Sequence, residues 1–92
     1  MAKIVVNINM FDVSQKVYYI QNDKQIKTIS VPLAELVNFI LHNEQWNKDI
    51  EEIDIEGNKD FIKKIGYDFI TGFKTQYSNR NVRILTNGEI LA

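Results

Sequence analysis

Apolar and polar residues alternate along the first eleven positions of the chain. One face carries Ile4, Val6, Ile8 and Met10, and the other carries Val5, Asn7, Asn9 and Phe11. This period of two predicts a half-buried strand over residues 3–11. Enrichment in β-branched and aromatic residues predicts a second strand over residues 17–20 and a third over 26–31, with turns at 12–15 and 22–23. The first third of the chain therefore predicts an antiparallel meander.

The spacing of apolar residues becomes helical after Pro32. Proline suits the first turn of a helix, and Ser30 lies close enough in sequence to cap it. Apolar residues then recur three and four positions apart and predict the face that packs on the sheet: Leu33, Leu36, Val37, Ile40 and Leu41. On a continuous helix of about 100° per residue, a second set falls on the opposite side or its flank, outside the core: Glu35, Phe39, His42 and Trp46.

Strand alternation resumes over residues 50–56. Ile53 and Ile55 point inward, whereas three acids, Glu52, Asp54 and Glu56, point outward, so one face of the strand is predicted to be solvated. A strand buried on both faces would carry a continuous apolar run instead. The pattern therefore favours helices on one side of the sheet only.

A second helix is predicted to follow a tight turn. Gly57 ends the strand, Asn58 can cap the helix, and Asp60 places a negative charge in the first helical turn. The helix runs roughly to Tyr77, with an apolar stripe formed by Phe61, Ile62, Ile65, Phe69 and Phe73. Gly66 and Gly72 lie on or beside this stripe, which predicts close approach of a neighbouring backbone.

The end of the chain predicts a loop over residues 78–81, a fifth strand over 82–86 and a terminal hairpin at Asn87-Gly88. The element order is therefore β-β-β-α-β-α-β followed by a short strand. Right-handed crossovers then give a mixed sheet with both helices on one face. We predict a single α/β domain over residues 1–92, built as a two-layer sandwich on an α+β mixed sheet.

Composition narrows the class of protein. Hydrophobic content of 45% with 25% charged residues is typical of a globular domain, and the absence of cysteine excludes disulfides and thiolate chemistry. No apolar run is long enough to span a bilayer, so a cytoplasmic protein without membrane contact is expected.

The net charge of −1 argues against a general nucleic-acid binder. Residues 1–57 carry −4 (five Lys against nine acids) and residues 58–92 carry +3, an asymmetry that suits self-association or a charged partner face.

The strand and helix order resembles the ribonuclease H-like fold. In the nucleases of that family, acids in the first strand, the first helix and the fourth strand hold two Mg²⁺ ions. Here the first strand offers Asn7 and Asn9 at the carboxylate position, with Asp12 just beyond, while Glu35 and Asp54 match the other two. The resemblance implies a degenerate metal-dependent nuclease or a nucleic-acid-binding domain, with Asp12, Glu35 and Asp54 as its metal set.

A basic outer stripe on the second helix and its continuation support the nucleic-acid alternative: Lys63, Tyr67, Lys74, Arg80 and Arg83. The acidic balance of the chain favours a solvated helix face instead. The Gly57 turn offers backbone N–H groups at a helix start, but Glu56 and Asp60 would repel an anion. An architectural turn is the favoured interpretation there.

The opening residues 3–12 resemble the start of small uncharacterised proteins of phages and prophages in low-GC Gram-positive bacteria. That resemblance implies a protein that binds a host factor. No catalytic residues are predicted, because His42 is the only histidine and has no nucleophile beside it in the sequence.

The leading interpretation is a non-enzymatic binding protein without a cofactor, whose partner is another protein, a second copy of the chain, or both; nucleic acid is less favoured. Its predicted contact surface is the outward stripe of Glu35, Phe39, His42 and Trp46, since exposed aromatic patches mark interfaces. The alternative is that Phe39 and Trp46 cover the rim of the core or the edge of the second helix.

Overall fold

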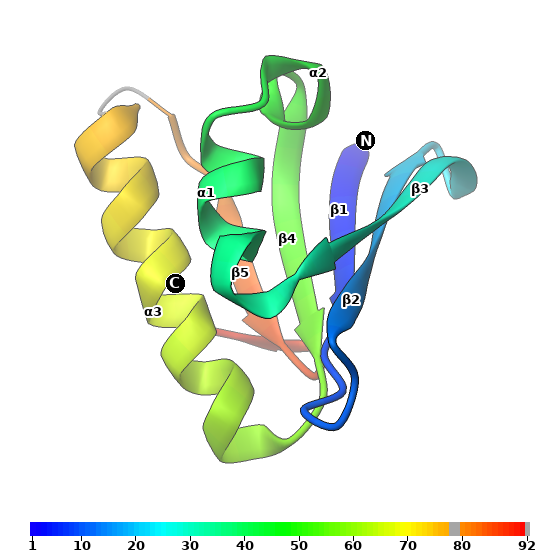
Figure 1. The fold of residues 1–92 in the computed structure, drawn as a ribbon. Coiled ribbons are helices and arrows are strands. Elements are labelled where there is room, and N and C mark those ends of the chain that lie inside the picture. The colour runs from blue at the N-terminus through cyan, green and yellow to red at the C-terminus, as the bar shows by residue number, and fades with distance from the viewer. Residues whose placement is uncertain (78–79, 92) are drawn as a thin grey trace.

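The computed structural model describes residues 1–77 and 80–91 and contains a six-stranded mixed sheet of order β3-β2-β1-β4-β5-β6 (Figure 1). Strands β1 and β4 pair in parallel, as do β4 and β5, and the remaining neighbours are antiparallel. The strands are β1 Ala2–Asn7, β2 Ser14–Gln21, β3 Lys24–Pro32, β4 Ile50–Glu56, β5 Arg83–Thr86 and β6 Glu89–Ile90. The predicted mixed α/β class is confirmed.

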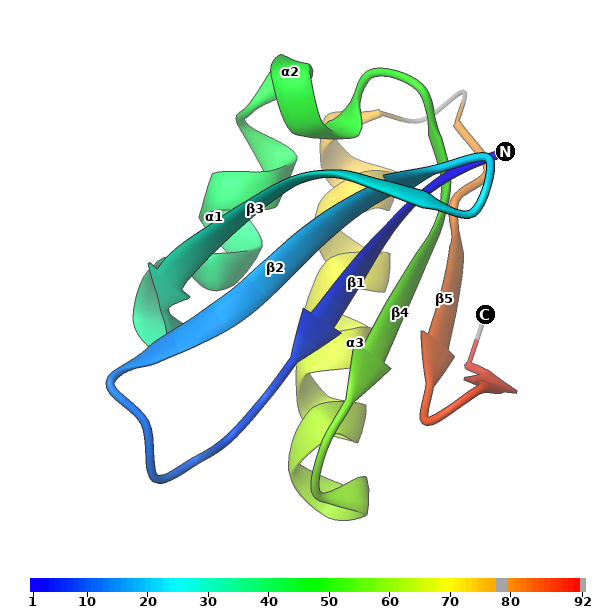
Figure 2. The same ribbon diagram turned by 90° about the vertical axis from the view of Figure 1, so that its right-hand side faces the viewer.

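The helices are the 3₁₀ helix η1 Leu33–Glu35, α1 Leu36–Leu41, α2 Glu44–Asn47 and α3 Lys59–Gln76. Figures 1 and 2 show all of them on one side of the sheet, with the other face bare. Helices on a single face, the strand at residues 50–56, the long second helix and the terminal hairpin agree with the sequence pattern. Of the loop predicted at residues 78–81, residues 78 and 79 lie outside the described ranges.

The core lies between the sheet and the helices. Isoleucines of β1 and β4 meet Leu36 and Ile40 of α1 and Phe69 of α3, and all are fully buried. Gly72 lets α1 and α3 pack closely, because a β-carbon there would collide with the Leu41 side chain. Gly66 approaches the Leu91 side chain in the same way. The predicted close approach is thus made to leucine side chains and not to a neighbouring backbone.

The turn from β4 into α3 requires glycine. Gly57 has φ of 152°, and a β-carbon there would lie 2.7 Å from the Ile8 carbonyl oxygen. Asn87 brackets the turn, because its side chain accepts from Gly57 N at 3.1 Å and donates to Gly57 O at 3.0 Å. Asn58 caps α3 by accepting from Phe61 N at 3.2 Å, as predicted. Since the Gly57 N–H is already bonded, the turn serves the architecture.

The first strand is shorter than the alternation predicts. Pairing between β1 and its neighbours ends at Asn7, and Ile8 N donates once more to Glu56 O at 2.8 Å before the chain turns. Residues 9–13 therefore form a loop between β1 and β2, and the prediction that Met10 and Phe11 lie in a strand is wrong. We call residues 9–13 the β1–β2 loop.

The first helix is also interrupted. It ends at Leu41, and a separate short helix begins at Glu44. The break arises because the Asn47 side chain donates to the carbonyls of Ile40 at 2.6 Å and Leu41 at 3.0 Å, which the next helical turn would otherwise bind. Ser30 does not cap this region, since Pro32 occupies the cap position and no side chain bonds there.

Candidate interaction surface

The β1–β2 loop presents large apolar side chains to solvent at one end of the sheet. Phe11 is 91% exposed and Val13 is 87% exposed, and Met10 is exposed beside them. Aromatic and aliphatic side chains of this size are usually withdrawn from water, because burying one contributes about 1.5–3 kcal/mol. An unburied cluster of this kind makes the loop a candidate contact surface.

A buried glutamine holds this loop in one conformation. Gln15 is 1% exposed; its Oε1 accepts from Asn9 N at 2.6 Å, and its Nε2 donates to the Asn9 and Asp12 carbonyls, each at 3.1 Å. Within the loop, Phe11 N donates to Asn9 Oδ1 at 3.1 Å and Asp12 N donates to Asn9 O at 3.0 Å. The loop conformation is therefore held by hydrogen bonds within the chain itself.

Sequence reasoning missed this loop because apolar alternation continues through Phe11. The local signal was Asn9, a residue that favours turns by bonding to the backbone two positions later. A second signal was Gln15. It occupies an inward-facing position of β2, as Val17 does, where the strand otherwise carries large apolar side chains. The sequence alone does not show which backbone groups the Asn9 and Gln15 side chains bond to.

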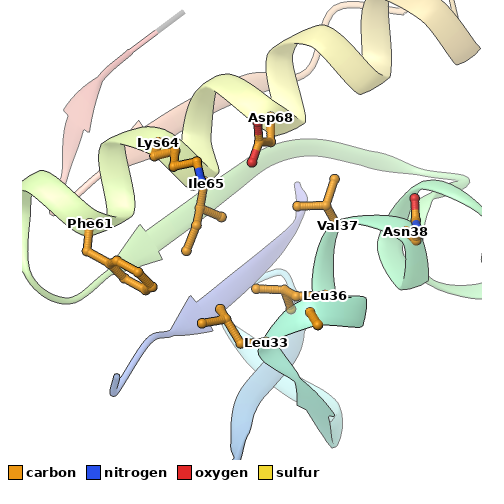
Figure 3. A pocket seen from close by; sticks show the side chains of 9 residues that line it. Leu33, Leu36, Val37, Asn38, Phe61, Lys64, Ile65 and Asp68 are labelled. Carbon is orange, nitrogen blue, oxygen red and sulfur yellow. The ribbon is translucent and has the colours of Figure 1, made fainter. Parts of the chain in front are cut away.

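An apolar groove of about 420 Å³ lies between α1 and the first half of α3 (Figure 3). Its walls are Leu33, Ala34, Leu36, Val37, Phe61 and Ile65, with Asn38, Lys64 and Asp68 as polar members. Phe61 also borders a second hollow that is lined by Met10 and Phe11. The groove and the β1–β2 loop are therefore neighbours on the surface, joined at Phe61.

The predicted aromatic stripe does not form an exposed surface. Trp46 is 6% exposed and belongs to the core, so its predicted outward position is wrong. The error follows from extending one helix past Leu41, because the break at His42 and Asn43 changes the direction in which Trp46 points. Glu35 and His42 are exposed, and Phe39 is half-buried.

Trp46 is enclosed by other side chains. Its ring packs edge-on against Tyr19 at 6.2 Å and against Phe39 at 5.7 Å between ring centroids. Lys27 covers the cluster, with its Nζ 4.9 Å from the Tyr19 ring and 5.1 Å from the Trp46 ring. The alternative interpretation, in which Phe39 and Trp46 cover the rim of the core, is confirmed.

The acids of the metal hypothesis lie on separate parts of the molecule. Asp12 is in the β1–β2 loop, Glu35 is in η1 on the helical side, and Asp54 is on β4 with its neighbour Lys3 on the bare face. Within residues 1–77 and 80–91, no three His, Cys, Asp or Glu residues come together to hold an ion. The metal set of Asp12, Glu35 and Asp54 is therefore wrong.

The basic residues of the nucleic-acid alternative do not form one free surface. Lys63, Tyr67 and Lys74 are exposed on α3. Arg80 instead bonds to the Asn47 and Ile50 carbonyls, the latter at 3.2 Å, and Arg83 pairs with Glu52 at 3.0 Å. Arg80 is thus bonded to the backbone, and Arg83 is exposed but paired with an acid of β4.

The bare face of the sheet carries a charge cluster of Lys3, Glu52, Asp54 and Arg83. Lys3 Nζ lies 3.4 Å from Asp54 Oδ2 and 4.0 Å from Glu52 Oε2. Glu52 is buried, so the prediction that its face of β4 is solvated is wrong for this residue. Burial raises the pKa of the Glu52 carboxyl above 4.5, Asp54 raises it further, and Arg83 and Lys3 oppose the shift.

The raised pKa of Glu52 predicts a pH dependence of stability. Between 4.5 and the folded pKa the native state binds more protons than the unfolded state, so this contribution to stability is lost as pH rises through that window. Glu52→Gln removes the titration. Urea unfolding of both proteins from pH 4 to pH 7 is expected to show the variant gaining stability relative to the wild type as pH rises.

Glu51→Gln is the matched control for Glu52→Gln, because Glu51 is the adjacent exposed acid of the same strand. An equal pH dependence in Glu51→Gln would show that the effect does not come from the burial of Glu52. A constant difference for Glu52→Gln would contradict the raised pKa.

Comparison with protein-family models, curated proteins and solved structures finds no match for this chain. None of the helices in the described ranges combines the length and apolar content that crossing a membrane requires.

Proposed function

We propose that this chain is a small non-enzymatic binding protein that contacts another protein chain through the β1–β2 loop. The supporting observation is that Phe11 stands 91% exposed on a loop ordered by hydrogen bonds. Phenylalanine and methionine are enriched in protein interfaces, and a rigid aromatic side chain loses little entropy on binding. This contact surface replaces the stripe around Trp46.

The chemistry of the loop favours protein over the other partner classes. Its one charged residue is Asp12, so it lacks the basic residues that phosphate backbones and anionic lipids require. The resemblance of residues 3–12 to small phage proteins favours a host factor as one partner, and a second copy of the chain is the other. The nucleic-acid alternative stays a prediction.

Photo-crosslinking tests the proposal. A benzophenone amino acid in place of Phe11 is expected to give covalent adducts with a protein chain in the cells that express it. The same group in place of Ile90, which is 71% exposed on β6, is expected to give several-fold less adduct. The mass of the Phe11 adduct then separates a second copy from a different protein.

Equal labelling from both positions, or no adduct from position 11, would refute the proposal. Both replaced side chains are exposed, so the fold is expected to survive in each variant.

A further inference from the structure

We propose that the groove between α1 and α3 is filled by the β1–β2 loop of a second copy of this chain, with Phe11 of each copy entering the groove of the other. This inference rests on the proposed function, since it names the partner of the same loop. The proposed dimer is isologous, which means that one surface patch meets its own copy across a two-fold axis.

The groove suits an aromatic side chain. Its walls are leucine, valine, isoleucine and phenylalanine side chains, and its volume of about 420 Å³ falls within the range of pockets that hold organic ligands. Figure 3 shows Leu33 of η1 and Leu36 of α1 facing Phe61 and Ile65 of α3 across it. A phenyl ring placed there would complete the apolar contacts that both the groove and Phe11 lack.

The loop and the groove offer one complementary pair of charges, Asp12 and Lys64, although the acid Asp68 also lines the groove. Asp12 follows Phe11 directly in the loop, and Lys64 lines the groove. Neither side chain forms an ion pair with any described residue of its own chain. Insertion of Phe11 would bring Asp12 to the groove mouth, where the Lys64 ammonium can pair with it.

The β1–β2 loop and the groove are placed so that two copies of the chain can form two identical contacts. The loop and groove adjoin at Phe61, so a two-fold axis near Phe61 brings each loop to the other copy's groove at once. A loop and groove on opposite ends of the molecule would instead link copies into open chains. Phe61 is itself half-buried and would become covered at such an axis.

Sedimentation velocity over a dilution series tests the dimer. The wild-type chain is expected to dissociate reversibly from dimer to monomer. Phe11→Ser is expected to raise the dissociation constant on the order of 100-fold or more, because an aromatic anchor is lost twice per dimer. Ile90→Ser removes an equally exposed apolar side chain elsewhere and is expected to leave the constant within about twofold.

A charge exchange tests the groove specifically. Asp12→Lys and Lys64→Glu, each alone, are expected to weaken the dimer roughly tenfold, and the double variant is expected to recover most of that loss. A wild type that stays monomeric at all concentrations would overturn the dimer; a Phe11 adduct with a different protein would then leave the proposed function standing. A dimer insensitive to Phe11→Ser, or a double variant without recovery, would overturn the loop-in-groove contact.

Discussion

Asn47→Ala is expected to lower the free energy of unfolding by about 3 kcal/mol, the largest effect we predict for a single polar side chain. Asn47 is 1% exposed and its Nδ2 donates to the carbonyls of Ile40 and Leu41. Alanine leaves the Ile40 carbonyl without this donor and the Leu41 carbonyl with the Tyr77 hydroxyl alone, and a buried unpaired group costs about 1–3 kcal/mol. For a domain whose total stability is about 5–15 kcal/mol, this is a large fraction.

The Asn47 interactions also join three separated segments. Asn47 Nδ2 donates to the Tyr77 hydroxyl at 3.3 Å, and Asn47 Oδ1 accepts from Arg80 Nη1 at 3.4 Å. The arginine also lies 5.2 Å from the Tyr77 ring. Loss of Asn47 is therefore expected to loosen the ends of α1 and α3 together.

Urea denaturation followed by circular dichroism measures the Asn47→Ala effect. Asn81→Ala is the matched control, because Asn81 is exposed and forms no side-chain bond to a described residue; its expected change is within about 0.5 kcal/mol. A loss of less than about 1 kcal/mol for Asn47→Ala would mean that water replaces the amide at the end of α1.

Gln15→Leu is expected to lower the free energy of unfolding by about 2 kcal/mol and to release the β1–β2 loop. Leucine is close in size but cannot bond to Asn9 N, Asn9 O or Asp12 O. The apolar side chains of the loop remain unchanged, so any loss of association comes from lost order. Hydrogen exchange at the Asn9 and Phe11 amides is expected to accelerate, and dimerisation is expected to weaken.

Gln21→Leu controls for the substitution itself, since Gln21 is an exposed glutamine at the other end of β2. It is expected to leave both loop exchange and dimerisation unchanged. Unaltered exchange at Asn9 in Gln15→Leu would show that the local Asn9 turn suffices to hold the loop.

Periodicity predicted much of the fold because its causes are local. The alternation over residues 50–56 and the apolar stripe of α3 each report which side of an element meets the core, and both agree with the structure. The cap at Asn58 and the hairpin at Asn87-Gly88 depend only on neighbouring residues.

Two predictions failed because the periodic pattern of residues continues past the end of the strand or helix. Alternation extended β1 to Phe11, and helical spacing extended the first helix to Trp46. In both cases a polar side chain later in the chain bonds to backbone groups at or just beyond the end of the element. Gln15 bonds to Asn9 beyond the end of β1, and Asn47 bonds to the carbonyls of the last two residues of α1.

Residue patterns were enough to predict the layers, the type of most elements and the placement of the helices on one side of the sheet. The candidate surface depends instead on tertiary contacts, which turn Trp46 inward, leave Phe11 in solvent and place the loop beside the groove at Phe61. The physical reason is that periodicity assigns a side chain to a face of its own element. Where that element ends, and what lies opposite it, depend on contacts between residues far apart in the chain.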